Sequence, residues 1–230
     1  MKTKILFPVI IFCLLYSWQV QAQEFSYQFF GGGNISYQSV NYDFGIKGID
    51  TSYTTDPRFT ANLGFGIKFD IKNFGIKLEA QYLKKSGKIT TGRVGEVPGF
   101  TAVQREYINS NDYIQLALLP QLNLPVITKS HIYINAGPYY SFTLAANETV
   151  YETTLLQNRS YSKDISGSIR SYDAGLIFGT GLEYTEAPYI GFTVGFRYSM
   201  GLQNILNIPD KDKISMKNNS FNFGVGIILK

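Results

Sequence analysis

The feature of this sequence that most restricts its fold is a two-residue alternation of apolar and polar or glycine positions, repeated along the chain. In residues 59–71 every odd position is apolar, and the even positions are threonine, asparagine, glycine, lysine and aspartate. Successive side chains of a β-strand point to opposite faces. The pattern therefore predicts a strand with one apolar face and one polar face.

The alternation restarts after Lys72 and Asn73, at Phe74, and continues to Tyr82. Two strands joined by so short a turn predict an antiparallel hairpin. The same pattern recurs strongly in residues 171–184, 190–199 and 221–229, and more weakly in residues 25–37, 112–123 and 131–145. The sequence therefore predicts eight strands.

Short and long connections alternate between these strands. The short ones are residues 72–73, 124–130 and 185–188, and the long, polar ones are residues 38–58, 86–111, 146–169 and 200–219. Outer-membrane barrels have short periplasmic turns and longer external loops. We therefore expect an all-β fold, an eight-stranded antiparallel up-and-down transmembrane β-barrel, with residues 23–230 forming a single domain.

The polar faces favour a membrane barrel over a soluble, lipocalin-like barrel. The soluble barrel stays the less favoured alternative. The many glycines of the polar faces would make a poor soluble exterior, and the strands match the ~9–11 residues that a transmembrane strand needs. The polar faces also carry charges of both signs, which we expect to pair across a narrow interior. These charged residues are Lys68, Asp70, Lys77, Glu79, Asp173, Glu183 and Arg197.

The first 22 residues predict export. Lys2 and Lys4 precede an apolar run over residues 5–16, and a small-residue pattern ends at Ala22. This is typical of a secretory signal peptide cleaved after that residue. The alternative, a membrane anchor, would need roughly 20 apolar residues. Cys13, the only cysteine, lies inside the apolar run, so no disulfide or thiol chemistry is expected in residues 23–230.

Several segments are similar to a known family. Residues 112–120 (DYIQLALLP) and 132–139 (IYINAGPY), with residues 179–183, 197–205 and 219–228, resemble the PorT-like outer-membrane β-barrel family of the Bacteroidetes. The resemblance covers nearly all of residues 23–230 and implies an integral protein of the Gram-negative cell outer membrane. The PorT protein itself takes part in secretion. The shared motifs are strand and turn features and carry no chemistry, so that role is not transferred.

A search for chemistry predicts no enzyme. His131, the only histidine, is expected on the periplasmic rim in contact with solvent. With one histidine and no cysteine after residue 22, a His/Cys zinc site is excluded. Glu79 and Glu183 are interpreted as members of ion pairs. We predict no catalytic, cofactor-binding or metal-binding residues and no cofactor.

Two pairs of aspartates and one run of three glycines each have a possible functional interpretation beside a structural one. Asp50 with Asp56, and Asp210 with Asp212, could bind calcium loosely, but their spacing matches no calcium loop. Residues 31–33 are three glycines in a strand without a following helix, so they predict a bend or close packing in that strand and not a phosphate loop.

The expected function is a non-enzymatic barrel. Its long loops would make contacts outside the cell, or its body would have a structural or secretion-assisting role in the envelope. The alternative is a small-molecule carrier or narrow pore, which eight strands disfavour because wide lumens occur at about 16 strands. Expected partners are outer-membrane lipid and envelope or secretion-complex proteins. The formal charge of +4 falls to +2 without Lys2 and Lys4, which predicts no nucleic-acid binding. The sequence identifies no ligand.

Overall fold

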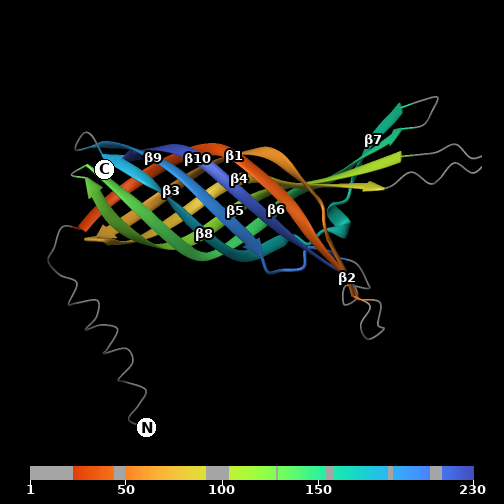
Figure 1. Cartoon of the computed structure of the whole chain (residues 1–230), viewed down its shortest axis with the longest axis horizontal. Coiled ribbons are helices and arrows are strands. Elements are labelled where there is room, and N and C mark those ends of the chain that lie inside the picture. Colours follow the sequence, from red (N-terminus) through yellow and green to blue (C-terminus); the bar gives the residue numbers. More distant parts are fainter. Residues whose placement is uncertain are drawn as a thin grey trace, which may run out of the picture.

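The computed structural model describes residues 23–43, 50–91, 104–127, 129–153, 158–185, 189–207 and 214–230 (Figure 1). These contain the strands β1 (Gln23–Asp43), β2 (Asp50–Thr54), β3 (Asp56–Ile71), β4 (Phe74–Thr91), β5 (Gln104–Ile127), β6 (Ser130–Thr153), β7 (Asn158–Asp164), β8 (Tyr172–Thr185), β9 (Ile190–Gly201) and β10 (Ile214–Leu229), and one 3-10 turn, η1 (Ser166–Ser168). No helix within these ranges is long and apolar enough to cross a membrane.

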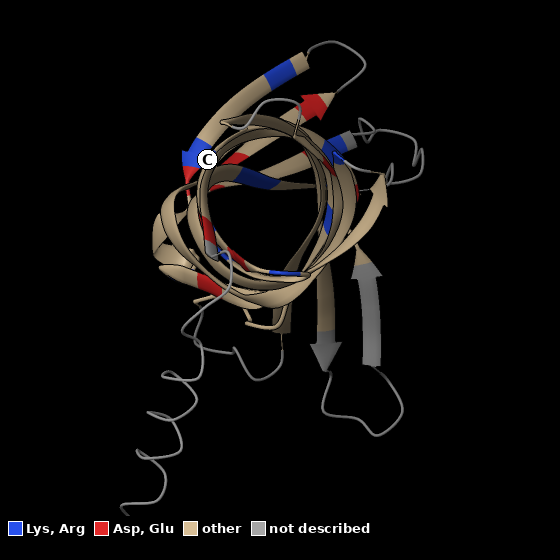
Figure 2. Ribbon diagram, turned by 90° about the vertical axis from the view of Figure 1, so that its left-hand side faces the viewer, with Lys and Arg blue, Asp and Glu red and all other residues tan. Residues whose placement is uncertain are grey.

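Eight of the strands form a closed ring. The order is β1-β3-β4-β5-β6-β8-β9-β10, and β10 pairs back onto β1. That closing ladder runs from Tyr27 opposite Leu229 to Tyr42 opposite Ile214, and every pairing in the ring is antiparallel. The ribbon accordingly forms a circle when viewed end-on (Figure 2). The prediction of an eight-stranded up-and-down barrel is confirmed.

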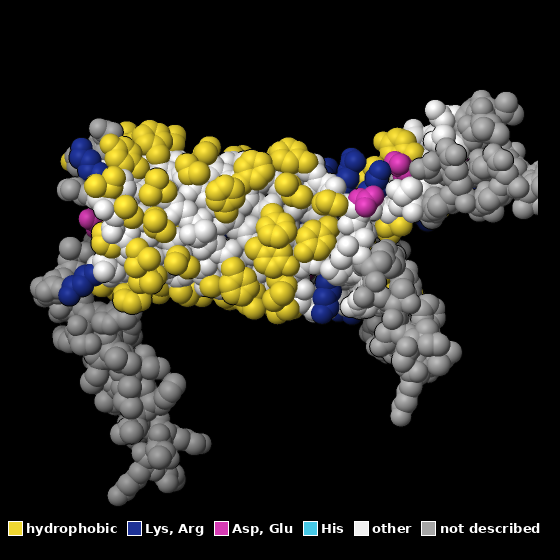
Figure 3. All heavy atoms as spheres, viewed as in Figure 1, with side chains coloured by type: hydrophobic (Ala, Val, Ile, Leu, Met, Phe, Trp, Pro, Cys, Tyr) yellow, Lys and Arg dark blue, Asp and Glu magenta, His cyan; other side chains and the backbone are white. Residues whose placement is uncertain are grey.

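The two faces of the wall differ as the alternation predicts. Phe29 and Leu63 point outward, with 52% and 68% of their surface exposed, whereas Gln28 and Asn34 point inward and are fully buried. Hydrophobic side chains cover the visible wall between two groups of lysine and arginine side chains, one near each end (Figure 3). Such an exterior is unfavourable in water but suits lipid, where a closed barrel satisfies its backbone hydrogen bonds internally.

The two ends of the ring are unlike. At one, here called the turn end, β1 begins, β10 ends, and Lys72 and Asn73 join β3 to β4. The connection expected over residues 124–130 is shorter than predicted, because β5 continues to Ile127 and β6 starts at Ser130. The opposite end, here called the loop end, is where the longer connections lie.

The expected long loops contain more strand than predicted. Residues 86–91 of β4, 104–110 of β5, 147–153 of β6 and all of β7 pair side by side and form what we call the distal sheet. β5 and β6 have 24 residues each, far more than a membrane crossing needs. The apolar alternation stops where the lipid-facing wall stops, but the backbone ladder continues beyond it, so the sequence pattern marked only the inner part of these strands.

The three glycines at residues 31–33 permit the close approach of β1 and β10. Gly32 pairs with Gly224, and a Cβ atom added to Gly32 would lie 2.0 Å from the backbone oxygen of Phe223. Backbone atoms in a closed ladder cannot move away from such a contact. The prediction of close packing at this position is confirmed.

Gly32→Ala is therefore expected to lower the free energy of unfolding by about 1–3 kcal/mol, the usual cost of overpacking. The measurement is urea unfolding from lipid vesicles, followed by far-UV circular dichroism. Gly167→Ala is the matched control, because a Cβ atom at that position meets nothing within 4 Å. Equal stability of the two variants would contradict the close approach.

Candidate functional site

The interior of the ring contains three clusters of paired charges. In the middle cluster the carboxylate of Glu79 accepts hydrogen bonds from both terminal nitrogens of Arg197, with Nη2 2.7 Å from Oε1. Lys77 Nζ lies 2.6 Å from the same oxygen. The Phe30 ring packs against both cations, 5.6 Å from Lys77 Nζ and 5.0 Å from Arg197 Cζ. β4 positions Lys77 and Glu79 two residues apart and hence on one face.

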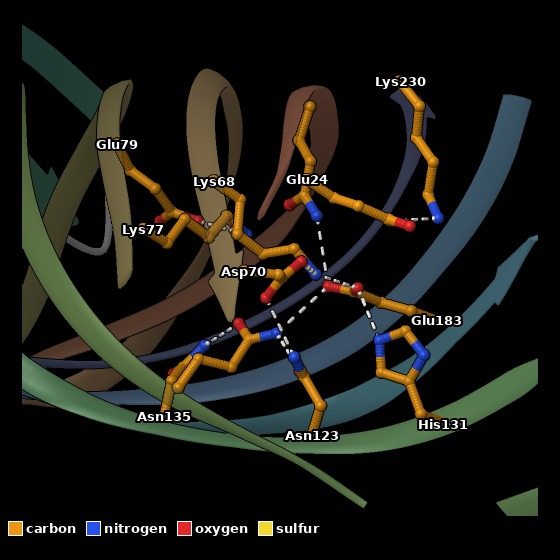
Figure 4. Close-up of polar contacts among 12 residues, drawn as sticks. Glu24, Lys68, Asp70, Lys77, Glu79, Asn123, His131, Asn135, Glu183 and Lys230 are labelled. Carbon is orange, nitrogen blue, oxygen red and sulfur yellow. Dashed lines mark hydrogen bonds and ion pairs between the residues drawn. The ribbon is translucent and has the colours of Figure 1, made fainter. Parts of the chain in front are cut away.

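The turn-end cluster is centred on Glu183 of β8 (Figure 4). Lys68 Nζ lies 2.5 Å from Glu183 Oε2 and 2.9 Å from Asp70 Oδ2. His131 Nε2 lies 2.8 Å from Glu183 Oε2, and Gln28 Nε2 donates to Oε1 at 3.1 Å. The Glu183 side chain is 1% exposed, so these partners replace the water it has lost.

The loop-end cluster joins Lys85 of β4 to Asp173 of β8, with Nζ 2.8 Å from Oδ2. Lys85 Nζ also lies 4.5 Å from the centre of the Tyr139 ring and 5.2 Å from that of Tyr113. Asn218 Nδ2 donates to Asp173 at 3.2 Å and to the Tyr113 hydroxyl at 3.1 Å. These side chains reach into the interior from five strands, β4, β5, β6, β8 and β10.

The three clusters balance each other in charge. They contain four cations and four carboxylates, namely Lys68, Lys77, Lys85 and Arg197 with Asp70, Glu79, Asp173 and Glu183.

Beside the middle cluster lies a cavity of about 30 Å³, which has room for about one or two water molecules. A larger cavity of about 470 Å³ opens at the turn end, lined in part by Lys68, His131 and Glu183. The middle of the barrel is therefore filled by side chains.

The expected orientation of the charged residues is confirmed. Lys68, Lys77, Glu79 and Glu183 are buried inside the ring and paired as predicted. His131 differs from its prediction. It does lie at the turn end, but its side chain is only 26% exposed and contacts Glu183 instead of solvent alone. The reason is that β6 and β8 place His131 and Glu183 directly opposite each other in the ladder.

The candidate calcium residues lie apart where they are described. Asp50 lies at the start of β2, opposite Asp43, and Thr54 at the end of the same strand is four residues, or about 13 Å, further along. Asp56 lies beyond Thr54, on β3, where it pairs with Lys88 of β4. Asp210 and Asp212 lie outside the described residues. Within the described ranges no group of three or more histidine, cysteine, aspartate or glutamate side chains could hold a metal ion.

Sequence reasoning missed several interior residues. Lys85 faces inward with Lys77, Glu79 and Gln81, and extending the alternation of β4 beyond Tyr82 would have found it. The interior is also less uniformly polar than predicted, because it contains an apolar cluster, two members of which pair with Glu79 and Lys77 of the middle cluster in the ladder. That cluster consists of Ala117, Leu119, Tyr139 and Ile177.

Breaking the Lys85–Asp173 pair tests whether the core depends on charge pairing. Lys85→Met leaves a buried carboxylate without its cation, so we expect the free energy of unfolding to fall by about 3–5 kcal/mol. The double variant Lys85→Met/Asp173→Asn removes both charges and should regain most of that loss. Urea unfolding in lipid vesicles measures all three proteins.

Lys84→Met is the control for this test. Lys84 is the adjacent residue on the outward face, and its pair with Asp112 spans 3.3 Å with 41% and 20% of the two side chains exposed. An exposed pair is worth at most about 1 kcal/mol. A loss for Lys85→Met no larger than that for Lys84→Met would contradict the role of the buried pair.

Comparison with solved structures finds similar barrels of low sequence identity. Ail from Yersinia pestis, solved with the heparin analogue sucrose octasulfate, is 14% identical with a TM-score of 0.36, over 90% of this chain and 99% of that one. Neisserial surface protein A is 11% identical with a TM-score of 0.40, over 91% and 99%. The outer membrane protease OmpT from Escherichia coli is 7% identical with a TM-score of 0.40, over 92% and 99%. None of these likenesses is strong enough to assign a function.

No curated protein matches this chain in sequence. A protein family does match, over residues 21–207, which is well over half of the chain, and it is described as an outer membrane protein beta-barrel domain. Its description agrees with the closed ring, the apolar wall and the paired interior. The chain belongs to this family of outer-membrane β-barrel proteins.

Proposed function

We propose that this protein is a closed, non-enzymatic outer-membrane barrel that holds a contact surface outside the cell. The observation that carries the proposal is a contrast between the two parts of the molecule. The interior is filled by paired charges and aromatic rings, whereas the distal sheet continues past the ring and is built from four strands. A barrel with a filled interior has its accessible surface at the ends.

The proposed orientation places the turn end in the periplasm and the distal sheet outside. Short periplasmic turns and longer external connections are general in this class of barrel, which supports this orientation. We also propose that residues 1–22, which lie outside the described residues, are a cleaved export signal, as their charge and hydrophobicity pattern indicates.

A finer assignment rests on sequence resemblance. The segments at residues 112–120 and 132–139 support membership of the PorT-like barrels of the Bacteroidetes. Both segments lie in β5 and β6, the strands that continue into the distal sheet. A partner consistent with the proposal is an envelope or secretion complex that contacts these two strands.

A carrier or narrow pore is the second candidate, favoured by the cavity of about 470 Å³ at the turn end. Passage of a solute would require the Glu79–Arg197 pair in the middle of the ring to separate. That pair is buried and bidentate, and opening it would separate the Arg197 guanidinium from its carboxylate in a medium of low polarity.

Planar-bilayer conductance of the full-length protein purified from outer membranes separates the two candidates. We expect no stable open events, because the middle cluster and its surrounding side chains fill the ring. A wide porin incorporated under the same conditions is the positive control. Large, lasting conductance steps that scale with the amount of protein would contradict the closed barrel.

The N-terminal residue of the same preparation tests the export signal. We expect it to be Gln23, and an uncleaved Met1 would contradict the signal.

A further inference from the structure

The cavity at the turn end is a polar chamber that the closure of the barrel does not require. Its volume of about 470 Å³ lies within the ~300–1,000 Å³ of most small-molecule sites. The ends of β1, β3, β5, β6, β8 and β10 and the turns beside them line it from inside the ring. A molecule that occupies it therefore comes from the aqueous phase at that end and not from the lipid around the wall.

The carboxylates that line this cavity already have cations beside them. Lys68 Nζ lies 2.9 Å from an oxygen of Asp70 and 2.5 Å from an oxygen of Glu183. Lys230 Nζ lies 2.7 Å from Glu24 Oε2, at the other side of the cavity (Figure 4). A positively charged ligand would therefore find no carboxylate without a cation on the described part of the lining.

Two lysines of the lining are without such a partner. Lys72 lies in the turn between β3 and β4, and Lys129 lies in the turn between β5 and β6. Neither forms an ion pair with a residue in the described ranges. The two turns are neighbours around the ring because β4 pairs with β5. The cavity thus has two available ammonium groups on one side of its rim.

The turn between β3 and β4 does not itself account for Lys72. The φ angle of this residue is 55°, in the left-handed region that glycine and asparagine adopt more readily than lysine. Two-residue hairpin turns ordinarily have asparagine or glycine at such positions. What lysine adds at this position is therefore its side chain, which lines the cavity.

A third polar group without a partner lies deeper in the cavity. Ser26 of β1 is 2% exposed, lines the cavity, and has no hydrogen-bond partner for its Oγ among the described residues. A buried hydroxyl without a partner is destabilising, and a serine hydroxyl can both donate and accept. Ser26 pairs with Lys68, four residues before Lys72, so about 13 Å of strand separates it from the turn.

We propose that the turn-end cavity binds a small, water-soluble phosphate ester, with its phosphate at Lys72 and Lys129 and its organic part toward Ser26. A phosphate monoester has about −1.5 to −2 charges at pH 7 and three strong acceptor oxygens, which suits two ammonium groups better than one carboxylate does. Because the lysines and Ser26 lie at different depths, inorganic phosphate can contact only one end of the site.

This site goes beyond the proposed contact surface, which lies at the opposite end of the ring. The ester would not pass through the barrel, because the Glu79–Arg197 pair and the side chains around it fill the middle. Only the compartment that supplies the ester, the periplasm, rests on the proposed orientation. Binding by the purified protein does not depend on that orientation.

Isothermal titration calorimetry of the full-length protein in detergent micelles tests the ligand class, with glucose 6-phosphate and glycerol 3-phosphate as probes. We expect saturable binding of glucose 6-phosphate that weakens as salt is added. Glucose should bind at least tenfold more weakly, because it lacks the charge-assisted hydrogen bonds of the phosphate. Inorganic phosphate should bind about fivefold more weakly, because it lacks the hydrogen bond to Ser26.

A double variant tests the two lysines. Lys72→Asn/Lys129→Gln removes both ammonium groups, and asparagine suits the left-handed conformation of residue 72. Its affinity for glucose 6-phosphate should fall at least tenfold. Lys84→Gln/Lys163→Gln is the matched control, because it removes as many cations from exposed positions on β4 and β7. This control should bind glucose 6-phosphate as the wild type does.

Ser26→Ala tests the deep end of the site. It should weaken the binding of glucose 6-phosphate about fivefold and leave the binding of inorganic phosphate unchanged. A general loss of structure would weaken both. Far-UV circular dichroism verifies that every variant keeps the strand content of the wild type.

The remaining outcomes would overturn the proposal. These are absence of binding by both esters at millimolar concentration, equal affinity for glucose and glucose 6-phosphate, and equal affinity of the lysine variant and its control. Inorganic phosphate that binds as tightly as the esters, or a Ser26→Ala variant that binds as the wild type does, would contradict the two-ended site. Short-chain phosphatidic acid that binds more tightly than glycerol 3-phosphate would contradict an aqueous source.

Failure of the proposed orientation is separate. Asn73→Cys, in the exposed turn beside Lys72, should react with a membrane-impermeant maleimide only after the outer membrane is permeabilised. Reaction on intact cells would contradict a periplasmic turn end without changing the calorimetric result.

Discussion

Every other feature of this structure depends on the requirement that a chain in lipid pairs its own backbone polar groups. The ladder between β1 and β10, which extends from Tyr27 opposite Leu229 to Tyr42 opposite Ile214, meets that requirement by closing the sheet. Closure gives each transmembrane strand one face toward lipid and one toward a narrow interior. The apolar positions of the alternation must then face outward, and Gly32 is needed where the closing strands approach most closely.

The interior follows from the same closure. Charged side chains on the inner face are removed from water, so each needs a partner of opposite sign. Four cations and four carboxylates meet this need in three clusters, and with the aromatic rings they fill the middle of the ring. The surface that remains for a partner outside the membrane is consequently at the ends of the ring. The strands that leave the lipid, β5 and β6, keep pairing and carry β7 to the outermost edge.

The sequence pattern predicted the transmembrane part well because apolar alternation records contact with lipid. It assigned Lys68, Glu79, Glu183 and Arg197 to the inner face correctly. Their partners were not predictable from it, because Glu79 and Arg197 are 118 residues apart and meet only through the stagger of the strands. The contact of His131 with Glu183 depends on the register that places them directly opposite each other in β6 and β8. β7 escaped prediction because both of its faces are polar and exposed, so no alternation marks it.

The most direct test of an apolar wall in lipid around a sealed interior uses two adjacent residues of β1. Phe29 is 52% exposed on the outer face, and Phe30 is 9% exposed on the inner face. A chain beginning at Gln23 contains no tryptophan, so Phe29→Trp and Phe30→Trp each introduce a single reporter. In vesicles of lipids brominated on their acyl chains, the account predicts strong quenching of the fluorescence at residue 29 and little at residue 30. Equal quenching at both positions, or the reverse order, would contradict it.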